Sequence, residues 1–205
     1  MSYYGTNRIQ EQGDRYGLFP AVAGAWIVSK EPFMEDLNFL NNFKLKASYG
    51  KAGNGRITIW DLTHAQYGYT GGYVYGDNFN SSSGMDQTQI PIQRKKFESS
   101  IESNFGIETR LFDNLHLNAD LFKIKRKNIF VSSTGQYSEV LGIFPEQTPS
   151  GEVENKGYEV DLSWKDRFGE FTYFITGRFS QYKNKIIDIN EEYRPYDYMK
   201  REGES

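Results

Sequence analysis

The side chains of this sequence that could contact a ligand are aromatic rather than catalytic. Between residues 51 and 99, one tryptophan and four tyrosines stand among glycines: Trp60, Tyr67, Tyr69, Tyr73 and Tyr75. Aromatic faces stack on sugar rings, and phenolic hydroxyls hydrogen-bond to polar ligands. Residues 67–75 also alternate, with mostly aromatic side chains at odd positions, which is typical of an extended strand. These five residues are our candidate ligand contacts. The alternatives are packing on a partner or a strand that continues beyond a sheet.

Groups for catalysis or metal binding are sparse. The chain has no cysteine, which excludes disulfides, thiolate zinc sites and cysteine nucleophiles. His64 and His116 stand too far apart for the spacing of a histidine metal site. Glu191 and Glu192 could be combined with other acids into a glycosidase pair, but no pattern places two carboxylates across a cleft. We therefore expect no catalytic residue, no cofactor, no metal site and no enzyme.

Three further motifs have ordinary explanations. The glycine-rich, basic stretch 50–56 lacks the Gly-Lys-Ser/Thr ending of a phosphate-binding loop, so it indicates a turn. Asp77, Asp86 and Asp188 offer oxygens to calcium, although no loop has the spacing of a calcium site. Basic clusters at 94–96 and 123–127 occur in a chain of net charge −3, which argues against a nucleic-acid binder. On a membrane barrel they would face lipopolysaccharide phosphates or form a solvated rim.

Alternation with a period of two dominates the chain and predicts six strands. Their ranges are 15–28, 43–50, 101–111, 115–125, 156–165 and 170–184. Pro20 interrupts the first range, as expected at an edge, a bulge or the start of a strand. Helical spacing is confined to residues 31–41, where we expect one or two turns. The sequence therefore predicts an all-β protein.

The connections between these strands differ in length in a regular way. Asp113-Asn114 and the stretch 166–169 predict short hairpin turns. Residues 51–99 and 126–155 are long and rich in Gly, Ser, Asn and Tyr. Short turns at one end and long extracellular loops at the other are the pattern of an outer-membrane β-barrel. A soluble sandwich also alternates, but it has no reason to sort its loops by end.

The barrel interpretation accounts for the charges. One face of the strands carries seven charged residues that could line a water-filled lumen: Glu102, Glu108, Arg110, Asp120, Glu159, Asp161 and Arg178. The other face is apolar and would meet lipid, so we predict that Phe43, Leu117, Leu162 and Ile175 share it. Five aromatic residues near strand ends fit interfacial girdles: Tyr49, Phe112, Trp164, Phe168 and Phe171. No apolar run reaches about 18 residues, and residues 1–14 have no apolar centre, so we expect neither a membrane-spanning helix nor a signal peptide.

Ordered motifs run from about Arg15 to about Asn184. They are Arg15-Tyr16-Gly17-Leu18-Phe19-Pro20, Gly24-Ala25-Trp26, Glu31-Pro32-Phe33-Met34, Leu37-Asn38-Phe39-Leu40, Leu45-Lys46-Ala47-Ser48-Tyr49-Gly50 with Gly53-Asn54, Asp120-Leu121-Phe122-Lys123 and Asn155-Lys156-Gly157-Tyr158-Glu159. This set resembles the C-terminal barrel region of SusC/RagA-type TonB-dependent outer-membrane transporters. Two departures are mild: Phe97 stands where the family usually has tryptophan, and Lys46 where an arginine is common.

The resemblance implies energised uptake of oligosaccharides or peptides across the outer membrane of a Gram-negative bacterium. It also implies a SusD-like surface lipoprotein and a TonB complex as partners, with lipid around the barrel and no nucleic acid. Plugged transporters need about 22 strands, so about six cannot enclose the lumen. We expect residues 1–205 to be a partial barrel domain: an antiparallel, curved open sheet of about six or more strands. A soluble all-β carbohydrate-binding module is the alternative, and a β-sandwich hydrolase the third hypothesis.

Overall fold

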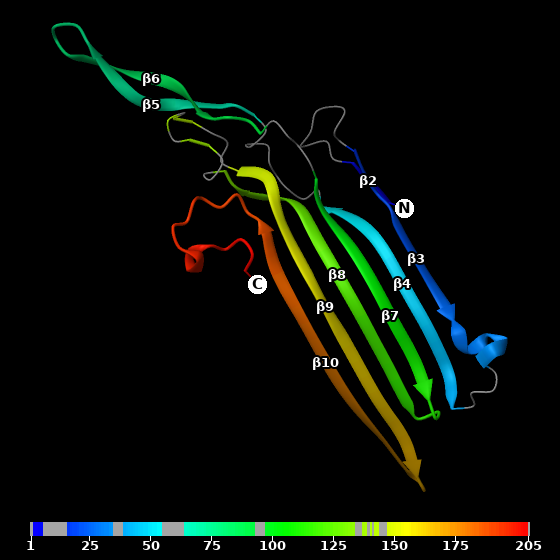
Figure 1. The fold of residues 1–205 in the computed structure, drawn as a ribbon. Helices are drawn as coiled ribbons and strands as arrows, with labels where there is room; N and C mark the ends of the chain where they lie inside the picture. The colour runs from blue at the N-terminus through cyan, green and yellow to red at the C-terminus, as the bar shows by residue number, and fades with distance from the viewer. Residues whose placement is uncertain are drawn as a thin grey trace.

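The computed structural model is dominated by one antiparallel sheet (Figure 1). It describes residues 2–5, 16–34, 39–54, 64–92, 97–133, 137–138, 140, 142–143 and 147–204. The sheet has six strands in the order β10-β9-β8-β7-β4-β3. Their bounds are β3 Ala21–Ile27, β4 Leu40–Asn54, β7 Glu98–Leu111, β8 Leu115–Ser132, β9 Gln147–Phe168 and β10 Phe171–Asp188. The expected all-β, open antiparallel sheet is confirmed.

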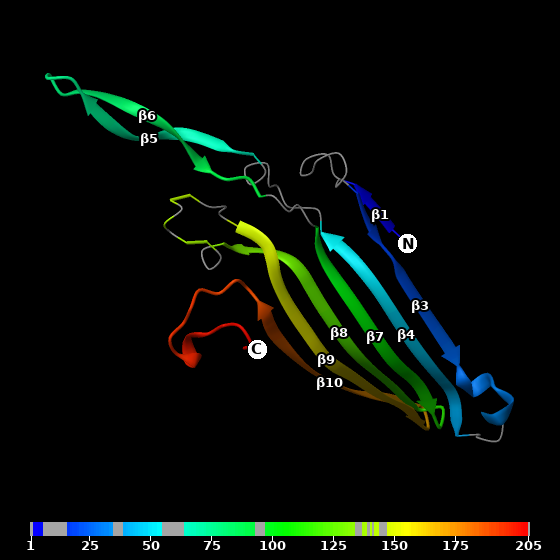
Figure 2. The ribbon, with the colours of Figure 1, turned by 45° about the horizontal axis from the view of Figure 1, so that its top comes forward.

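Smaller elements flank this sheet. The strand β1 (Ser2–Gly5) pairs with β2 (Tyr16–Phe19), and β5 (Gln66–Tyr75) pairs with β6 (Asn80–Gln89) as a separate hairpin. Short 3-10 turns are η1 (Val28–Lys30), η2 (Pro32–Met34) and η4 (Asp197–Met199). The turns η1 and η2 lie within or beside the range where one or two helical turns were expected. The β5–β6 hairpin extends beyond one end of the six-stranded sheet (Figure 2).

The strands are longer than the alternation predicts. The expected loop 51–99 begins with the end of β4, contains β5 and β6, and closes with the start of β7. The expected loop 126–155 likewise holds the end of β8 and the start of β9. Both ranges therefore hold strand segments as well as loops, and one of these segments is the strand that the alternation over 67–75 predicts. Period-two patterning marks a strand only where one face is apolar, so strand segments that are polar on both faces leave no such signal.

Two of the three connections at the turn end are short, the β3–β4 connection over 28–39 being longer, and both connections at the loop end are long. At the turn end, β7 and β8 are joined by residues 112–114, where Phe112 and Asp113 adopt φ of 53° and 62°. Asn41 fixes this turn, because its side-chain amide donates to Asp113 Oδ1 at 2.5 Å and its oxygen accepts the Asp113 N–H at 3.0 Å. At the loop end, the described parts of 55–97 and 133–146 form the longer connections.

The second hairpin turn is later than expected. Strand β9 continues through Phe168, which pairs with Phe171, so the turn consists of Gly169 and Glu170. Gly169 has φ of 62°, which glycine adopts without strain at the first central position of a two-residue hairpin. The range 166–169 was therefore wrong by about three residues.

The register gives the sheet two distinct faces. Cross-strand partners share a face, and a set of such partners across the sheet is called a row here. Leu117 pairs with Leu162 and with Thr109, which pairs with Phe43, and Ile175 lies two residues from Gly177, the partner of Leu162. The predicted common face of Phe43, Leu117, Leu162 and Ile175 is thus confirmed, and we call it the apolar face. The seven predicted charged residues share the opposite, polar face.

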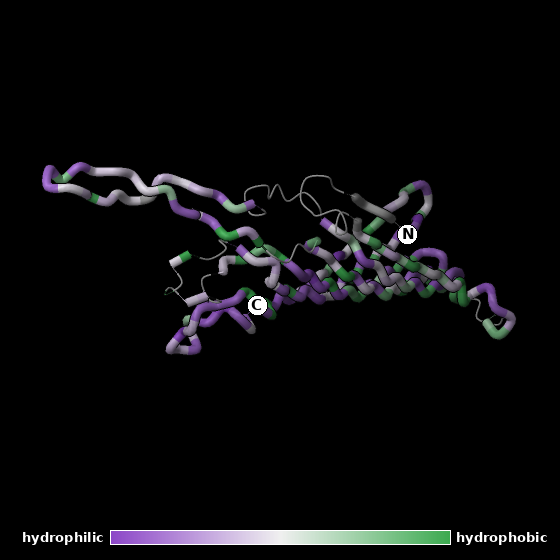
Figure 3. Tube along the Cα trace, turned by 90° about the horizontal axis from the view of Figure 1, so that it is seen from above, coloured by the Kyte–Doolittle hydropathy of each residue, from purple (hydrophilic) through white to green (hydrophobic). Residues whose placement is uncertain are grey.

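The apolar face is not covered by any described segment. Leu121, Ile175 and Phe179 are 56%, 66% and 58% exposed. The buried apolar side chains among the described residues are Phe19, Val28 and Ile92. Hydrophilic and hydrophobic residues alternate along the sheet instead of collecting in one core (Figure 3). Contiguous exposed apolar surface of this extent marks a face that meets something other than water.

The chain after β10 folds back beside the loop end. Backbone hydrogen bonds join Ile186 N–H to Glu204 O at 3.0 Å and Gly203 N–H to Ile186 O at 2.8 Å. The Glu191 carboxylate accepts the N–H groups of Arg201 at 2.8 Å and Glu202 at 3.1 Å. Among the described residues, no helix is long and apolar enough to span a bilayer.

Candidate functional site

The polar face carries charges of both signs in neighbouring strands. One row runs Lys44, Glu108, Asn118, Asp161 and Arg178 across β4, β7, β8, β9 and β10. Lys44 Nζ lies 3.4 Å from Glu108 Oε2, and Arg178 Nε lies 3.1 Å from Asp161 Oδ1. Opposite charges at cross-strand positions stabilise a sheet modestly, and these pairs stay exposed to water. The positive and negative charges of the polar face thus nearly cancel one another.

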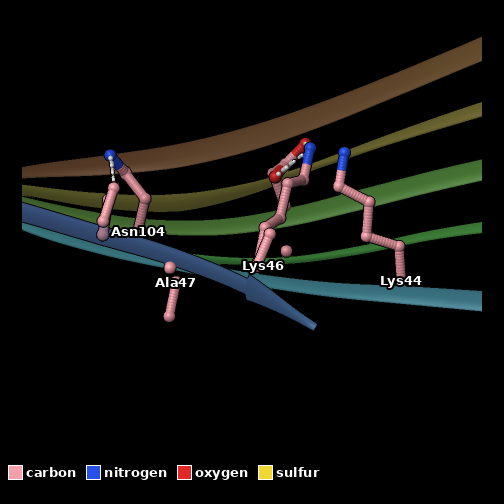
Figure 4. Close-up of a pocket in the computed structure, with 10 residues that line it drawn as sticks. Lys44, Lys46, Ala47 and Asn104 are labelled. Carbon is pink, nitrogen blue, oxygen red and sulfur yellow. Dashed lines mark hydrogen bonds and ion pairs between the residues drawn. The ribbon is translucent and has the colours of Figure 1, made fainter. Parts of the chain in front are cut away.

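Lys46 forms the most connected group on this face (Figure 4). Its Nζ lies 3.0 Å from Asn118 Oδ1 and 3.0 Å from Asp120 Oδ1, and Asn118 Nδ2 donates to Asp120 Oδ2 at 2.9 Å. Lys46 and Asp120 come from β4 and β8, with β7 between them. The residue between them is Gly106, where a Cβ would come within 2.1 Å of Asp120 Oδ1 and 2.3 Å of Lys46 Cε. The buried Gly106 therefore leaves the space in which the ion pair crosses a whole strand.

A shallow depression of about 400 Å³ lies beside this group. The small residues Ala23, Gly24 and Ala25 of β3 leave it open next to the longer side chains of Lys44, Lys46 and Asn104. Asn104 Nδ2 donates to Ser48 Oγ at 3.3 Å. The surface offers amide, hydroxyl, ammonium and carboxylate groups to a hydrated ligand. It suits hydrogen bonding to a passing polar solute rather than covalent chemistry.

The candidate tyrosines lie together on β5, whereas Trp60 lies outside the described residues. Tyr67, Tyr69, Tyr73 and Tyr75 are 65%, 75%, 61% and 54% exposed. The rings of Tyr73 and Tyr75 are 6.0 Å apart between centroids. The strand over 67–75 is confirmed, with an irregularity between Tyr69 and Gly72. The structure brings four tyrosines onto one hairpin, and their contact with a ligand stays a prediction.

The other residues considered as catalytic or metal-binding groups make contacts within the fold instead. Glu191 holds backbone N–H groups of the C-terminal segment, and these hydrogen bonds keep the pKa of its carboxyl below its usual range. Among the described residues, no three His, Asp or Glu side chains gather as metal ligands do. The basic cluster 94–96 lies outside the described residues. Phe97, in the place of the usual tryptophan, packs edge-on against Phe19 with ring centroids 6.1 Å apart.

The sequence did not reveal the individual roles of two glycines, Gly106 and Gly157, on the polar face. Gly106 makes room for Lys46 and Asp120. A Cβ at Gly157 would lie 2.4 Å from the Gln181 carbonyl oxygen and 2.9 Å from Tyr182 Cα, both backbone atoms of β10. Glycine inside a strand marks a close backbone approach, which is the signal that was available.

An open antiparallel sheet with one polar face, one exposed apolar face and connections sorted by end defines a segment of a β-barrel wall. The family model of the "TonB dependent receptor-like, beta-barrel" matches residues 2–200. The chain belongs to this family. It is not a soluble carbohydrate-binding module, so that alternative was wrong.

Named relatives agree with this assignment. The chain is 32% identical to the TonB-dependent receptor P3 of Formosa agariphila over 87% of this chain and 17% of that protein. It is 30% identical to the TonB-dependent receptor P39 of the same organism, over 100% of this chain and 19% of that protein. It is 22% identical to the TonB-dependent receptor SusC of Bacteroides thetaiotaomicron over 92% of this chain and 19% of that protein. The chain thus spans less than a fifth of the length of each of these relatives.

Solved structures show the same fold. The RagAB peptide importer in its "open-open" state matches 90% of this chain and 19% of its own chain, with a TM-score of 0.68 and 18% identity. Its "closed-closed" state matches 87% of this chain and 19% of its own, with a TM-score of 0.66 and 19% identity. The resemblance to SusC/RagA-type transporters is confirmed.

Proposed function

We propose that this chain is a section of the barrel wall of a TonB-dependent receptor that imports a nutrient across the outer membrane. The observation that carries the proposal is the two-faced sheet, since its apolar face is exposed over four consecutive rows while its polar face carries balanced charges. On β9, these four rows run from Tyr158 to Trp164, and the same face continues through Asp166 to Phe168 at the turn. Eleven residues suffice for a tilted strand to cross a bilayer. The apolar face then meets lipid, and the polar face lines the lumen.

The loop end would be extracellular, because long loops of such barrels lie outside and short turns lie in the periplasm. The β5–β6 hairpin would then lie outside the cell, and residues 1–205 would form part of one barrel domain. The tyrosines of β5 would contact either an incoming oligosaccharide or peptide, or a SusD-like surface lipoprotein. SusC among the relatives and the RagAB peptide importer among the solved structures support these classes of ligand and partner.

Uptake by the complete receptor that contains this chain tests the proposal. Cells that carry the receptor should accumulate a labelled oligosaccharide or oligopeptide, and depletion of TonB should abolish the accumulation. Replacing Tyr67, Tyr69, Tyr73 and Tyr75 with serine should reduce uptake without changing the amount of receptor in the outer membrane. A receptor that reaches the outer membrane but accumulates neither ligand class, with or without TonB, would contradict the proposal.

A further inference from the structure

Lysines replace apolar residues on the apolar face just beyond its loop-end limit. The row that follows Ala47, Phe105, Leu121 and Tyr158 contains Lys123, Lys156 and Lys183 as direct partners on β8, β9 and β10. We call these three residues the lysine row. All three are exposed. Like charges directly opposite each other destabilise a sheet, so the lysine row has an electrostatic cost that an anion would remove.

The carboxylates nearby neutralise only part of this charge. Toward the loop end, the described part of the same face holds seven lysines and three carboxylates: Lys51, Lys123, Lys125, Lys127, Lys156, Lys183 and Lys185, with Glu152, Glu154 and Asp188. Glu154 Oε2 lies 3.0 Å from Lys123 Nζ, and the carboxylate of Glu152 lies 2.5 Å from Lys125 Nζ and 3.5 Å from Lys127 Nζ. Among the described residues, Lys156, Lys183 and Lys185 form no ion pair.

The position of the lysine row fits the boundary of the membrane. Residues 158–168 of β9 span about 25 Å along the membrane normal at the usual rise and tilt of a barrel strand, which is the height of the apolar band of such barrels. Lys156 lies two residues beyond this stretch, so the lysine row stands at the level of lipid headgroups. Because neighbouring strands lie about 4.8 Å apart, the row is about 10 Å wide.

We infer that the lysine row, with Lys185 beside it, binds the phosphate groups of an anionic lipid in the leaflet around the loop end. The inference rests on the proposed function, which places the apolar face in lipid. The acyl chains would cover the apolar face below the row, and the phosphates would separate the three ammonium groups. Lysine binds phosphate as a compact charge, and polybasic clusters at a membrane surface recognise anionic headgroups in this way.

Lipid exchange into nanodiscs of defined composition tests the inference with the complete receptor. The discs contain phosphatidylcholine with a small fraction of either diphosphoryl lipid A or a phosphate-free analogue, and native mass spectrometry counts the lipid that stays bound. Wild type should retain diphosphoryl lipid A. Lys156→Gln combined with Lys183→Gln should lower its affinity about thirty-fold at low salt, because each lysine near an anionic surface contributes about fivefold.

The matched control is Lys30→Gln combined with Lys165→Gln, which removes the same charge from two exposed lysines at the turn end. This control should bind diphosphoryl lipid A as wild type does. Equal losses in both double variants, or equal retention of the two lipids by wild type, would overturn the inference while the barrel remains inserted. A wild-type receptor that fails to insert into bilayers would instead overturn the proposed function, and the inference with it.

Discussion

Lysines on the two faces of one sheet have opposite surroundings. On the polar face, Lys44 and Lys46 each share the sheet with a carboxylate that their Nζ atoms reach at 3.4 and 3.0 Å. On the other face, Lys123, Lys156 and Lys183 stand side by side, and Glu154 reaches Lys123 Nζ at 3.0 Å, while Lys156 and Lys183 form no ion pair with any described residue. The two polar-face lysines are therefore paired within the protein. The lysine row keeps an excess of positive charge that an anion from outside the protein would balance.

The largest expected effect comes from introducing a positive charge on the apolar face, compared with the same charge on the polar face. Phe179→Arg places a guanidinium in the middle of the apolar face, where a cation in lipid costs about 2–4 kcal/mol. Ser180→Arg, one residue further on the same strand, faces Glu159 on the polar face and should leave the free energy of unfolding nearly unchanged. Urea unfolding of the complete receptor from bilayers measures the free energy of unfolding of both variants. Equal destabilisation would show that the two faces do not differ in environment.

A smaller effect is expected where strands approach closely on the polar face. Gly157→Ala pushes a methyl group against the backbone of β10, and overpacking of this kind costs about 1–3 kcal/mol. Gly177→Ala lies on the apolar face of the same strand pair, where a Cβ meets no atom within 4 Å. This control substitution should leave the free energy of unfolding unchanged in the same measurement. If Gly157→Ala left the free energy of unfolding unchanged, β9 and β10 would have to lie further apart than in this structure.

The ion pair across β7 gives a third, weaker contrast. Gly106→Ala should displace Lys46 from Asp120 and lower the free energy of unfolding by about 1 kcal/mol, since the pair is partly exposed to water. Gly24→Ala, on the apolar face of β3, has open space around its Cβ and serves as the control. In the background of Asp120→Asn, the effect of Gly106→Ala should shrink, because the charged partner is already absent. An undiminished effect would assign the loss to backbone strain.

The smallest effect is a pH dependence at the loop end, beyond the apolar stretch. Hydrogen bonds from Lys125, and more weakly from Lys127, hold the pKa of Glu152 below its usual range against the opposing effect of burial. The stability that ionised Glu152 contributes to the folded state is fully present above the usual carboxyl pKa, and it is lost as the pH falls through the lowered pKa. The difference in unfolding free energy between wild type and Glu152→Gln should be about 1 kcal/mol or less at pH 7 and vanish once the pH has fallen below the lowered pKa of Glu152. A constant difference across this range would exclude the ionic contribution.

Period-two patterning predicted most of the sheet and both of its faces, because an apolar stripe is a property of single strands. Leu115, Leu117 and Leu121 alternate with polar residues whatever strand lies beside them. The lysine row depends instead on register, which is set by the turns at Phe112–Asn114 and Gly169–Glu170. Lys123, Lys156 and Lys183 are some 30 residues apart in sequence, so no local pattern brings them together. The same holds for Gly106, whose role appears only with Lys46 and Asp120 on either side.

Single-cysteine scanning along β8 tests the two-faced wall most directly, since this chain contains no cysteine of its own. Cysteine replaces each of residues 116–125 in turn in the complete receptor, in outer-membrane vesicles, and a membrane-impermeant thiol reagent reports exposure to water. Positions 116, 118 and 120 should react, and positions 117, 119 and 121 should be protected. Protection should end at Lys123 and Lys125. Uniform reactivity over residues 116–121, or the opposite alternation, would contradict a barrel wall with lipid on its apolar face.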